Sequence, residues 1–295
     1  MMLRFTRLNR SAIFALIALT ALALLAGCGG SGDDTTDSST TSNTDSTTTD
    51  GSGPPPSTEP LTAPKADESI DDSAKRLTAA VKKDDCDAIN EFLPTARSDT
   101  QATKAGCKQV QARLDGADVD GTESYDDSAA VIDFTRGVRT TTALMVVDRT
   151  GRYKLAQLNG FLGEKSAGTK LAPEFDKAAK TVTKAFADDD CKAFRENASA
   201  LLGPGNARRS DKLVCAYVSK GPPARLLKEN PKAKPESIGG NSQFAFYGLS
   251  SDTLFLTMIM TRQTGKNLPE GVKLPEGAAE YVFLDAVPTN AAPAG

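Results

Sequence analysis

Apolar side chains recur at helical spacing in two similar segments of the chain. Residues 70–89 and 175–194 are identical at nine of twenty positions without a gap. In both segments the apolar positions follow an i, i+4, i+7, i+11 spacing, which forms one stripe along a helix. These stripes are Ile70, Ala74, Leu77 and Val81, and Phe175, Ala179, Val182 and Phe186. Each predicted helix ends in Asp-Asp-Cys, where an Asp would cap a second short helix.

The periodicity changes downstream of each pair of predicted helices. The segments there are rich in β-branched and aromatic residues, which favours strands. The predicted strands are 131–134, 141–148 and 153–158, and then 243–247, 253–260 and 281–287. We therefore expect an α+β fold of two tandem repeats, 66–165 and 170–290. Each would consist of two helices and a curved antiparallel sheet of three or four strands, with the helices on one face.

The first 27 residues have the pattern of a signal peptide. Three arginines precede an apolar run at 12–25, which is shorter than the roughly 20 residues of a membrane span. The run ends in Leu25-Ala26-Gly27-Cys28, which resembles the bacterial lipobox. The resemblance implies that Cys28 becomes the first residue, carries diacylglycerol and palmitate, and anchors the chain to the extracytoplasmic face of the cell membrane. An ordinary secretory signal and a retained membrane anchor are the alternatives.

Residues 28–65 are dominated by Ser, Thr, Asp, Gly and Pro, which predicts a disordered stalk after the lipidated cysteine. Six acids and no base occur between residues 29 and 64, whereas 32 bases balance 32 acids from residue 65 onward. We expect no nucleic-acid partner, because no basic excess marks the folded part as a whole. Residues 291–295 are predicted to be a disordered tail.

The chain has no histidine, which excludes His-dependent catalysis and His-ligated metal sites. Four cysteines remain after Cys28, at separations of 21 and 24 residues within the two repeats. In an oxidising compartment we expect them to pair as Cys86–Cys107 and Cys191–Cys215. Of the three possible pairings, only this one respects the duplication. A site of four cysteine ligands is the alternative, but no Cys-x-x-Cys spacing occurs, and we expect neither a metal nor a cofactor.

Helices, Asp-Cys junctions and sheets in this order resemble the nuclear-transport-factor-2-like, or cystatin-like, domains of exported bacterial lipoproteins. The resemblance covers about 68–162 and 172–288, and it implies cone-shaped domains with a pocket between sheet and helices. Some members of that family are isomerases or dehydratases with an Asp/Tyr or Asp/His set, and many are binding or accessory modules. Such domains often pair through their sheets. A tandem repeat would satisfy that pairing within one chain, so we expect a monomer.

Candidate chemistry lies in the last strand of each predicted repeat. Strict alternation would put Tyr281, Phe283 and Asp285 on one face. Asp285 would then act as a base, with Tyr281 or Tyr247 donating a hydrogen bond to a developing oxyanion. The alternative is a solvated Asp285 near the strand end. The matching positions of the first repeat are Tyr153, Leu155 and Gln157, and we expect them to line a pocket as well. Met258 and Met260 would form a further pocket wall, although core packing is the ordinary explanation for these methionines.

These patterns favour a non-enzymatic lipoprotein that binds a small apolar molecule or a protein of the cell envelope. The alternative is a small-molecule isomerase or hydratase that uses Asp285 and a tyrosine of the second repeat. Two further features have ordinary explanations. The Asp clusters at 84–85 and 188–190 fit helix capping better than calcium binding, which needs six or more converging oxygens. The basic stretch at 228–234 is either an exposed loop or a contact for acidic envelope polymers.

Overall fold

The computed structural model describes residues 60–94, 100–162, 166–200, 203–205, 209–264, 274 and 276–291. These residues all belong to one compact unit that begins at Pro55. The predicted signal peptide, Cys28 and the stalk before residue 60 lie outside the described residues. The prediction of a disordered stalk is wrong for its last residues, because the Leu61 N–H donates to the Ser251 carbonyl at 3.0 Å. The predicted tail 291–295 also lies outside the described residues, except for Ala291, which is the last residue of β8 and not part of a tail.

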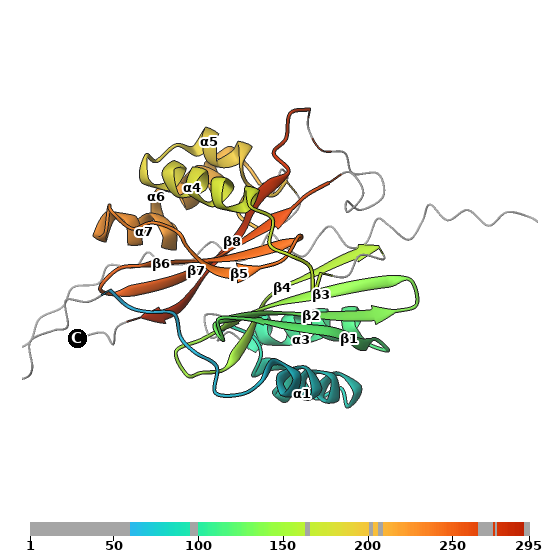
Figure 1. Cartoon of the computed structure of the whole chain (residues 1–295). Coiled ribbons are helices and arrows are strands. Elements are labelled where there is room, and N and C mark those ends of the chain that lie inside the picture. The colour runs from blue at the N-terminus through green and yellow to red at the C-terminus, as the bar shows by residue number, and fades with distance from the viewer. Residues whose placement is uncertain are drawn as a thin grey trace, which may run out of the picture. The chain divides into compact units, whose positions relative to one another are not determined.

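The chain has an α+β fold with two antiparallel four-stranded sheets (Figure 1). The first half contains α1 (Ile70–Lys82), α2 (Cys86–Asn90), α3 (Thr100–Leu114), β1 (Asp118–Tyr125), β2 (Ala129–Arg136), β3 (Arg139–Val147) and β4 (Tyr153–Leu162). The second half contains α4 (Glu174–Ala187), α5 (Cys191–Glu196), α6 (Asp211–Lys220), α7 (Pro222–Glu229), β5 (Glu236–Gly240), β6 (Phe244–Ser250), β7 (Leu254–Arg262) and β8 (Tyr281–Ala291). In each sheet the strands follow one another in chain order.

The helices α1 and α4 form where the apolar stripes predict them. All eight stripe residues are buried. The side chain of Asp85 caps α2 by accepting from the Ala88 N–H at 3.0 Å, and Asp190 caps α5 by accepting from the Ala193 N–H at 2.9 Å. The predicted capping role of these Asp residues is therefore confirmed, and it satisfies N–H groups that the first helical turn leaves without partners.

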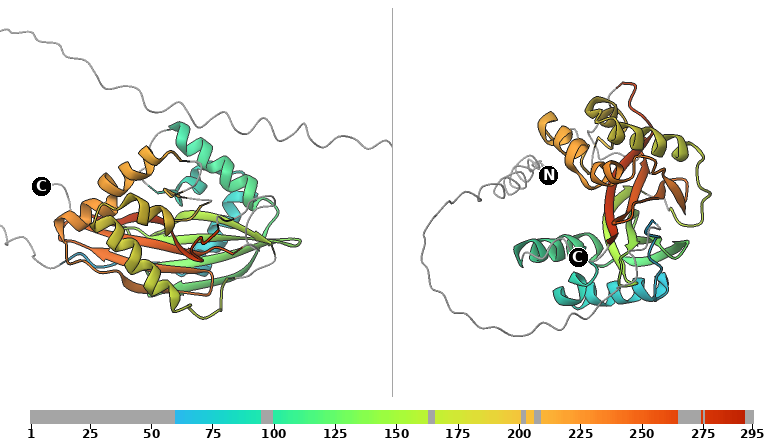
Figure 2. Two further views of the ribbon diagram at one scale, coloured as in Figure 1. Left: turned by 90° about the horizontal axis from the view of Figure 1, so that it is seen from above. Right: turned by 90° about the vertical axis from the view of Figure 1, so that its left-hand side faces the viewer.

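Each set of helices covers one face of its own sheet, as expected for an α+β unit. One core joins α1, α2 and α3 to β2, β3 and β4, and a second joins α4 to α7 with β6, β7 and β8. Figure 2 shows the helices on the outer side of the two sheets. Burial of these stripes and strands supplies most of the apolar contact in each half.

The opposite faces of the two sheets pack against each other. A third core contains Tyr125, Ala129, Val131, Leu144 and Val146 from the first sheet and Phe244, Phe246, Ile259 and Leu284 from the second. The rings of Tyr125 and Phe246 are 5.6 Å apart, and the Asn241 amide donates to the Tyr125 hydroxyl at 2.9 Å. At this junction Gly239 has φ +146°, and a Cβ there would lie 2.8 Å from Cβ of Tyr125. A side chain at that position would therefore require Tyr125 or the backbone of β5 to shift.

A buried carboxylate fixes the segment that leads from the first half to the second. Asp133 on β2 is fully buried and accepts from the hydroxyls of Thr142 and Ser166 at 2.5 and 2.9 Å. It also accepts from the N–H groups of Ser166 and Ala167 at 2.7 and 2.9 Å. These four hydrogen bonds compensate the desolvation of the carboxylate and hold the linking segment against the first sheet.

The structure differs from the sequence prediction in the number of elements. Each sheet has four strands, and the first strand of each, β1 or β5, was not predicted. Each half also has more than the two expected helices, because α3 follows α2, and α6 and α7 follow α5. β1 carries an exposed, polar sequence and β5 ends in two glycines, so neither has the apolar alternation that marks a strand.

Candidate functional site

The predicted common face of Tyr281, Phe283 and Asp285 is wrong for Asp285. In the pairing of β7 with β8, Met260 lies opposite Phe283 whereas Ile259 lies opposite Asp285, so Leu284 is an extra residue in a β-bulge. Phe283 and Met260 belong to the core under the helices, and Ile259 and Leu284 belong to the core between the sheets. The bulge therefore turns Asp285 away from Tyr281 and Phe283 and toward the other sheet.

The first half has the same irregularity, so the predicted face of Tyr153, Leu155 and Gln157 is wrong for Gln157. Met145 lies opposite Leu155 and Leu144 lies opposite Gln157, which leaves Ala156 as the extra residue. Tyr153 and Leu155 pack under the helices, whereas Leu144 packs between the sheets. Gln157 consequently shares the face of Leu144 and not that of Tyr153.

The two displaced side chains meet between the halves. The Gln157 amide lies 3.5 Å from the Asp285 carboxylate and donates a long hydrogen bond to it. Both residues are partly buried. Asp285 thus serves in the contact between β4 and β8, which is a different environment from the apolar pocket that the sequence predicted.

The two tyrosines considered as partners of Asp285 lie on the helix-covered side of the second sheet. The Tyr247 hydroxyl donates to the Asp176 carboxylate at 2.6 Å, and the ring of Tyr281 stands edge-on to Phe175 at 4.8 Å. Burial, followed by the Asp176 carboxylate, raises the pKa of Tyr247 far above its ordinary value. The geometry therefore does not assemble Asp285 with Tyr247 or Tyr281.

The predicted pocket residues are divided between cores and one small cleft. Tyr153, Phe283, Met258 and Met260 are buried among core side chains, which agrees with the ordinary explanation for the methionines. Leu155 and Gln157 line a cleft of about 120 Å³ between α3 and β4. Its other walls include the side chain of Arg113, which donates to the Leu158 carbonyl at 2.5 Å.

A larger cavity of about 310 Å³ lies beside α5 and contains none of the predicted pocket residues. Its walls are Lys192, Arg195, Glu196, Ala198, Ala200, Gln263, Glu276, Gly277 and Ala278. The Gln263 side chain is buried there, and it accepts from the Ala200 N–H and donates to the Ala279 carbonyl. Its polar atoms are therefore already satisfied within the chain.

Tyr217 on α6 is a polar residue that the sequence reasoning missed. Its hydroxyl is buried and makes no hydrogen bond among the described residues, while its ring packs against Phe186, Phe194 and Phe283. Burial and then the charge of Asp285 raise its pKa well above the ordinary value, and Arg209 opposes that effect. A tyrosine next to the helical positions Val214 and Val218 has the pattern of a core residue, so nothing in the sequence singled it out.

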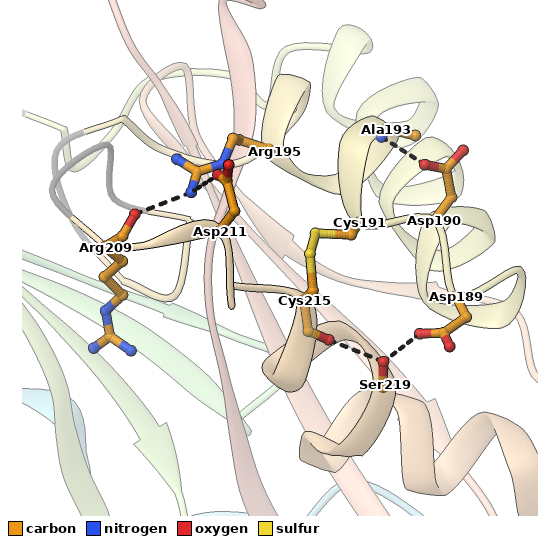
Figure 3. Close-up of a disulfide and its surroundings, with 9 residues drawn as sticks. All are labelled: Asp189, Asp190, Cys191, Ala193, Arg195, Arg209, Asp211, Cys215 and Ser219. Carbon is orange, nitrogen blue, oxygen red and sulfur yellow. Dashed lines mark hydrogen bonds and ion pairs between the residues drawn. A yellow bond between two sulfur atoms is a disulfide. The ribbon is translucent and has the colours of Figure 1, made fainter. Parts of the chain in front are cut away.

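The structure contains both of the expected disulfides, Cys86–Cys107 and Cys191–Cys215. Figure 3 shows how the second one joins the start of α5 to α6. Beside it the Ser219 hydroxyl bonds to the Asp189 carboxylate at 2.6 Å, and Arg195 pairs with Asp211 at 2.7 Å (Figure 3). Asp190 caps α5, as expected, and Asp189 accepts from the Ser219 hydroxyl.

Metal sites and membrane-spanning helices are two further features considered for the part of the chain that the structure describes. No cluster of acids and cysteines there has the arrangement of a metal site, and no described helix has the length and apolar character of a membrane span. Comparison with protein-family models, curated proteins and solved structures finds no match for this chain.

Proposed function

We propose that the chain is a lipid-anchored lipoprotein of the cell envelope whose two halves form a non-enzymatic binding or accessory module. The lipobox-like Leu25-Ala26-Gly27-Cys28 and the stalk composition of 28–65 support the anchor on the extracytoplasmic face. The ligand under this proposal is a small apolar molecule or an envelope protein.

The two halves are proposed to be tandem repeats with the nuclear-transport-factor-2-like design. Their sequence similarity extends to unusual backbone features. Asp84 and Asp189, at matching places, both adopt left-handed φ values of 52° and 56°. The Leu155 N–H donates to the Phe92 carbonyl at 2.6 Å, and the Phe283 N–H donates to the Asn197 carbonyl at 2.8 Å. Together with the paired bulges and disulfides, these correspondences favour one ancestral unit that was copied.

The observation that carries the non-enzymatic proposal is the contact between Gln157 and Asp285 across the two sheets. It places Asp285, the base of the enzymatic alternative, in a contact at the junction of the halves and away from Tyr281 and Tyr247. The packing of sheet on sheet also occupies, within one chain, the face through which such domains would otherwise pair. A monomer is therefore the proposed oligomeric state.

Native mass spectrometry of the exported Cys28→Ser chain, kept unreduced, tests the binding role. Extra mass that survives desalting would support an occupied ligand site and would give its chemical class. A bare monomer mass would remove the small-molecule version and leave an envelope protein as the partner, to be sought by cross-linking. A dimer mass would contradict the intramolecular pairing.

The enzymatic alternative has a separate test in the Asp285→Asn variant. If the chain shows isomerase or hydratase activity on any small-molecule panel, and the variant loses it while its unfolding transition stays intact, the non-enzymatic proposal fails. Asn preserves the size of the side chain and a carbonyl oxygen that can accept from Gln157, so the fold should survive.

A further inference from the structure

The helices α6 and α7 and the turn after them carry a local excess of positive charge. Between residues 209 and 236 there are seven bases and three acids, although the chain from residue 65 onward is neutral. Asp211 pairs with Arg195 of α5, and Glu229 accepts from the hydroxyls of Ser251 and Thr253, so neither acid forms an ion pair with a base of this region. All three acids keep their charge, and seven bases against three acids leave an excess of four positive charges.

We call the exposed bases and one exposed apolar side chain of α6, α7 and the following turn the basic surface. It comprises Lys212, Leu213, Lys220, Arg225, Lys228, Lys232 and Lys234, all exposed. Within the described residues, none of its bases forms an ion pair, and Lys228 instead donates to the Ser219 carbonyl at 2.9 Å. That bond brings the end of α7 next to the end of α6.

Leu213 adds an apolar group to the basic surface. Its side chain is 50% exposed, which makes it one of three large apolar residues exposed in the part of the chain that the structure describes. It follows Lys212 directly on α6, and Lys220 lies seven residues further along the same helix face. An apolar side chain among lysines on a surface helix is the arrangement that favours the headgroup region of a membrane.

The chain enters the folded unit beside this surface. The Leu61 N–H donates to the Ser251 carbonyl at 3.0 Å, at the turn between β6 and β7. The Asn230 amide donates to the neighbouring Ser250 carbonyl at 3.1 Å, and Asn230 lies two residues before Lys232. Figure 1 shows the blue segment starting at the end of the second half where α7 lies. A tether that leads to Cys28 would therefore leave the domain close to its most basic region.

We infer that the basic surface docks on the anionic phospholipid headgroups of the membrane to which the proposed lipid anchor is attached. The inference rests on the proposed function for the position of the membrane, but the surface itself comes from α6, α7 and the turn at 230–234. The tether confines the domain near the bilayer, so each weak headgroup contact acts at a high effective concentration. Docking would hold the second half down and leave the first half facing away from the bilayer.

Vesicle co-sedimentation of residues 28–295 with Cys28→Ser, exported behind an ordinary secretory signal peptide, isolates this contact from the lipid. The vesicles are phosphatidylglycerol with phosphatidylcholine, or phosphatidylcholine alone. We expect binding to the anionic vesicles that weakens as salt rises, and at least about tenfold weaker binding for Lys232→Glu/Lys234→Glu, since each base near the surface contributes on the order of fivefold. Leu213→Ser should weaken binding severalfold and leave its salt dependence unchanged.

Lys104→Glu/Lys108→Glu provides the matched control. Both lysines are exposed on α3, the disulfide-linked helix of the first half, and the change in charge is the same. The control should bind as the parent does. Equal losses in the two variants, equal binding to both vesicle types, or no binding would overturn the inference. Binding that appears only after the acids at 33–59 are neutralised would also overturn it. The occupant of the basic surface would then be that acidic segment of the same chain and not the membrane. The two proposals can fail separately. If Cys28 is lipidated but the Cys28→Ser chain does not bind anionic vesicles, the proposed anchor is supported and the docking inference is wrong.

Discussion

The amide of Gln157 and the carboxylate of Asp285 lie 3.5 Å apart, although 128 positions separate them in the chain. Each follows the extra residue of a bulge in the last strand of its half. The two residues thus occupy corresponding places and meet between the two sheets. Asp285, which the sequence suggested as a catalytic base, therefore contacts the other half of the chain.

This relationship predicts energetic coupling between the two halves. In a double-mutant cycle of Gln157→Ala and Asp285→Ala, the free energies of unfolding should deviate from additivity by about 0.5–1 kcal/mol. Denaturant unfolding of the parent, both single variants and the double variant measures the coupling. The control cycle of Gln157→Ala with Asp252→Ala, whose Asp is exposed in the β6–β7 turn, should be additive. Additivity in both cycles would contradict a working contact at the junction.

The two disulfides should each contribute separately to stability. Replacement of Cys86 and Cys107 by Ser, or of Cys191 and Cys215 by Ser, should lower the free energy of unfolding by about 3 kcal/mol, because loops of 21 and 24 residues are released in the unfolded chain. Thermal and denaturant unfolding in the Cys28→Ser background gives the values. A loss below about 1 kcal/mol for either pair would show that its loop closure matters little.

Asp133 should be among the most sensitive polar positions. Asp133→Ala leaves the buried N–H groups of Ser166 and Ala167 without their acceptor, so the free energy of unfolding should fall by about 3 kcal/mol. Proteolysis near residue 166 should also become faster, since the linking segment loses its attachment. The exposed Asp252→Ala variant is the comparison and should change stability by less than about 0.5 kcal/mol. Similar effects of both changes would show that the carboxylate does not hold the linker.

All five tyrosines should resist ionisation while the chain is folded. Burial is the first cause of a raised pKa for each of them, at Tyr125, Tyr153, Tyr217, Tyr247 and Tyr281. In the unfolded chain their pKa is about 10, so the unfolded state releases protons first as the pH rises. The stability that the neutral hydroxyls contribute is therefore complete below about pH 10 and is lost above it.

Ultraviolet titration of tyrosinate, followed together with circular dichroism, measures this effect. The folded chain should titrate above pH 10 and lose its structure in the same range, whereas the urea-unfolded chain should titrate near pH 10. Several tyrosines ionising at the ordinary pKa in a chain that keeps its fold would contradict the described burial.

Much of the fold could be predicted because the pattern repeats. The stripes of α1 and α4 have helical spacing, and the cysteines keep similar places in both halves, so helix faces and disulfides followed from the residues. β1 and β5 were missed because they are short of apolar residues. The sheets also pack against each other through residues of both halves. A local sequence pattern cannot predict this contact, because the residues that make it are about a hundred or more positions apart.

The candidate site could not be predicted because two single-residue bulges decide it. Period-2 alternation holds from Leu254 to Met260, and the methionines lie where it places them. It fails at Ala156 and Leu284, where one extra residue reverses the faces of the side chains that come next. Gln157 and Asp285 therefore turn from the helix-covered faces to the junction of the sheets, and the predicted catalytic face does not form.

The intact mass of the chain recovered unreduced from the membrane fraction of a lipoprotein-processing bacterial host tests the central claim most directly. The account predicts residues 28–295 with a diacylglyceryl group and a palmitoyl chain on Cys28, and a mass four hydrogens lower for the two disulfides. The Cys28→Ser chain should lack the lipid mass and keep its first 27 residues, because the lipobox cysteine is missing. A parent chain that begins at another residue without lipid, or one that keeps its first 27 residues, would contradict the proposed anchor.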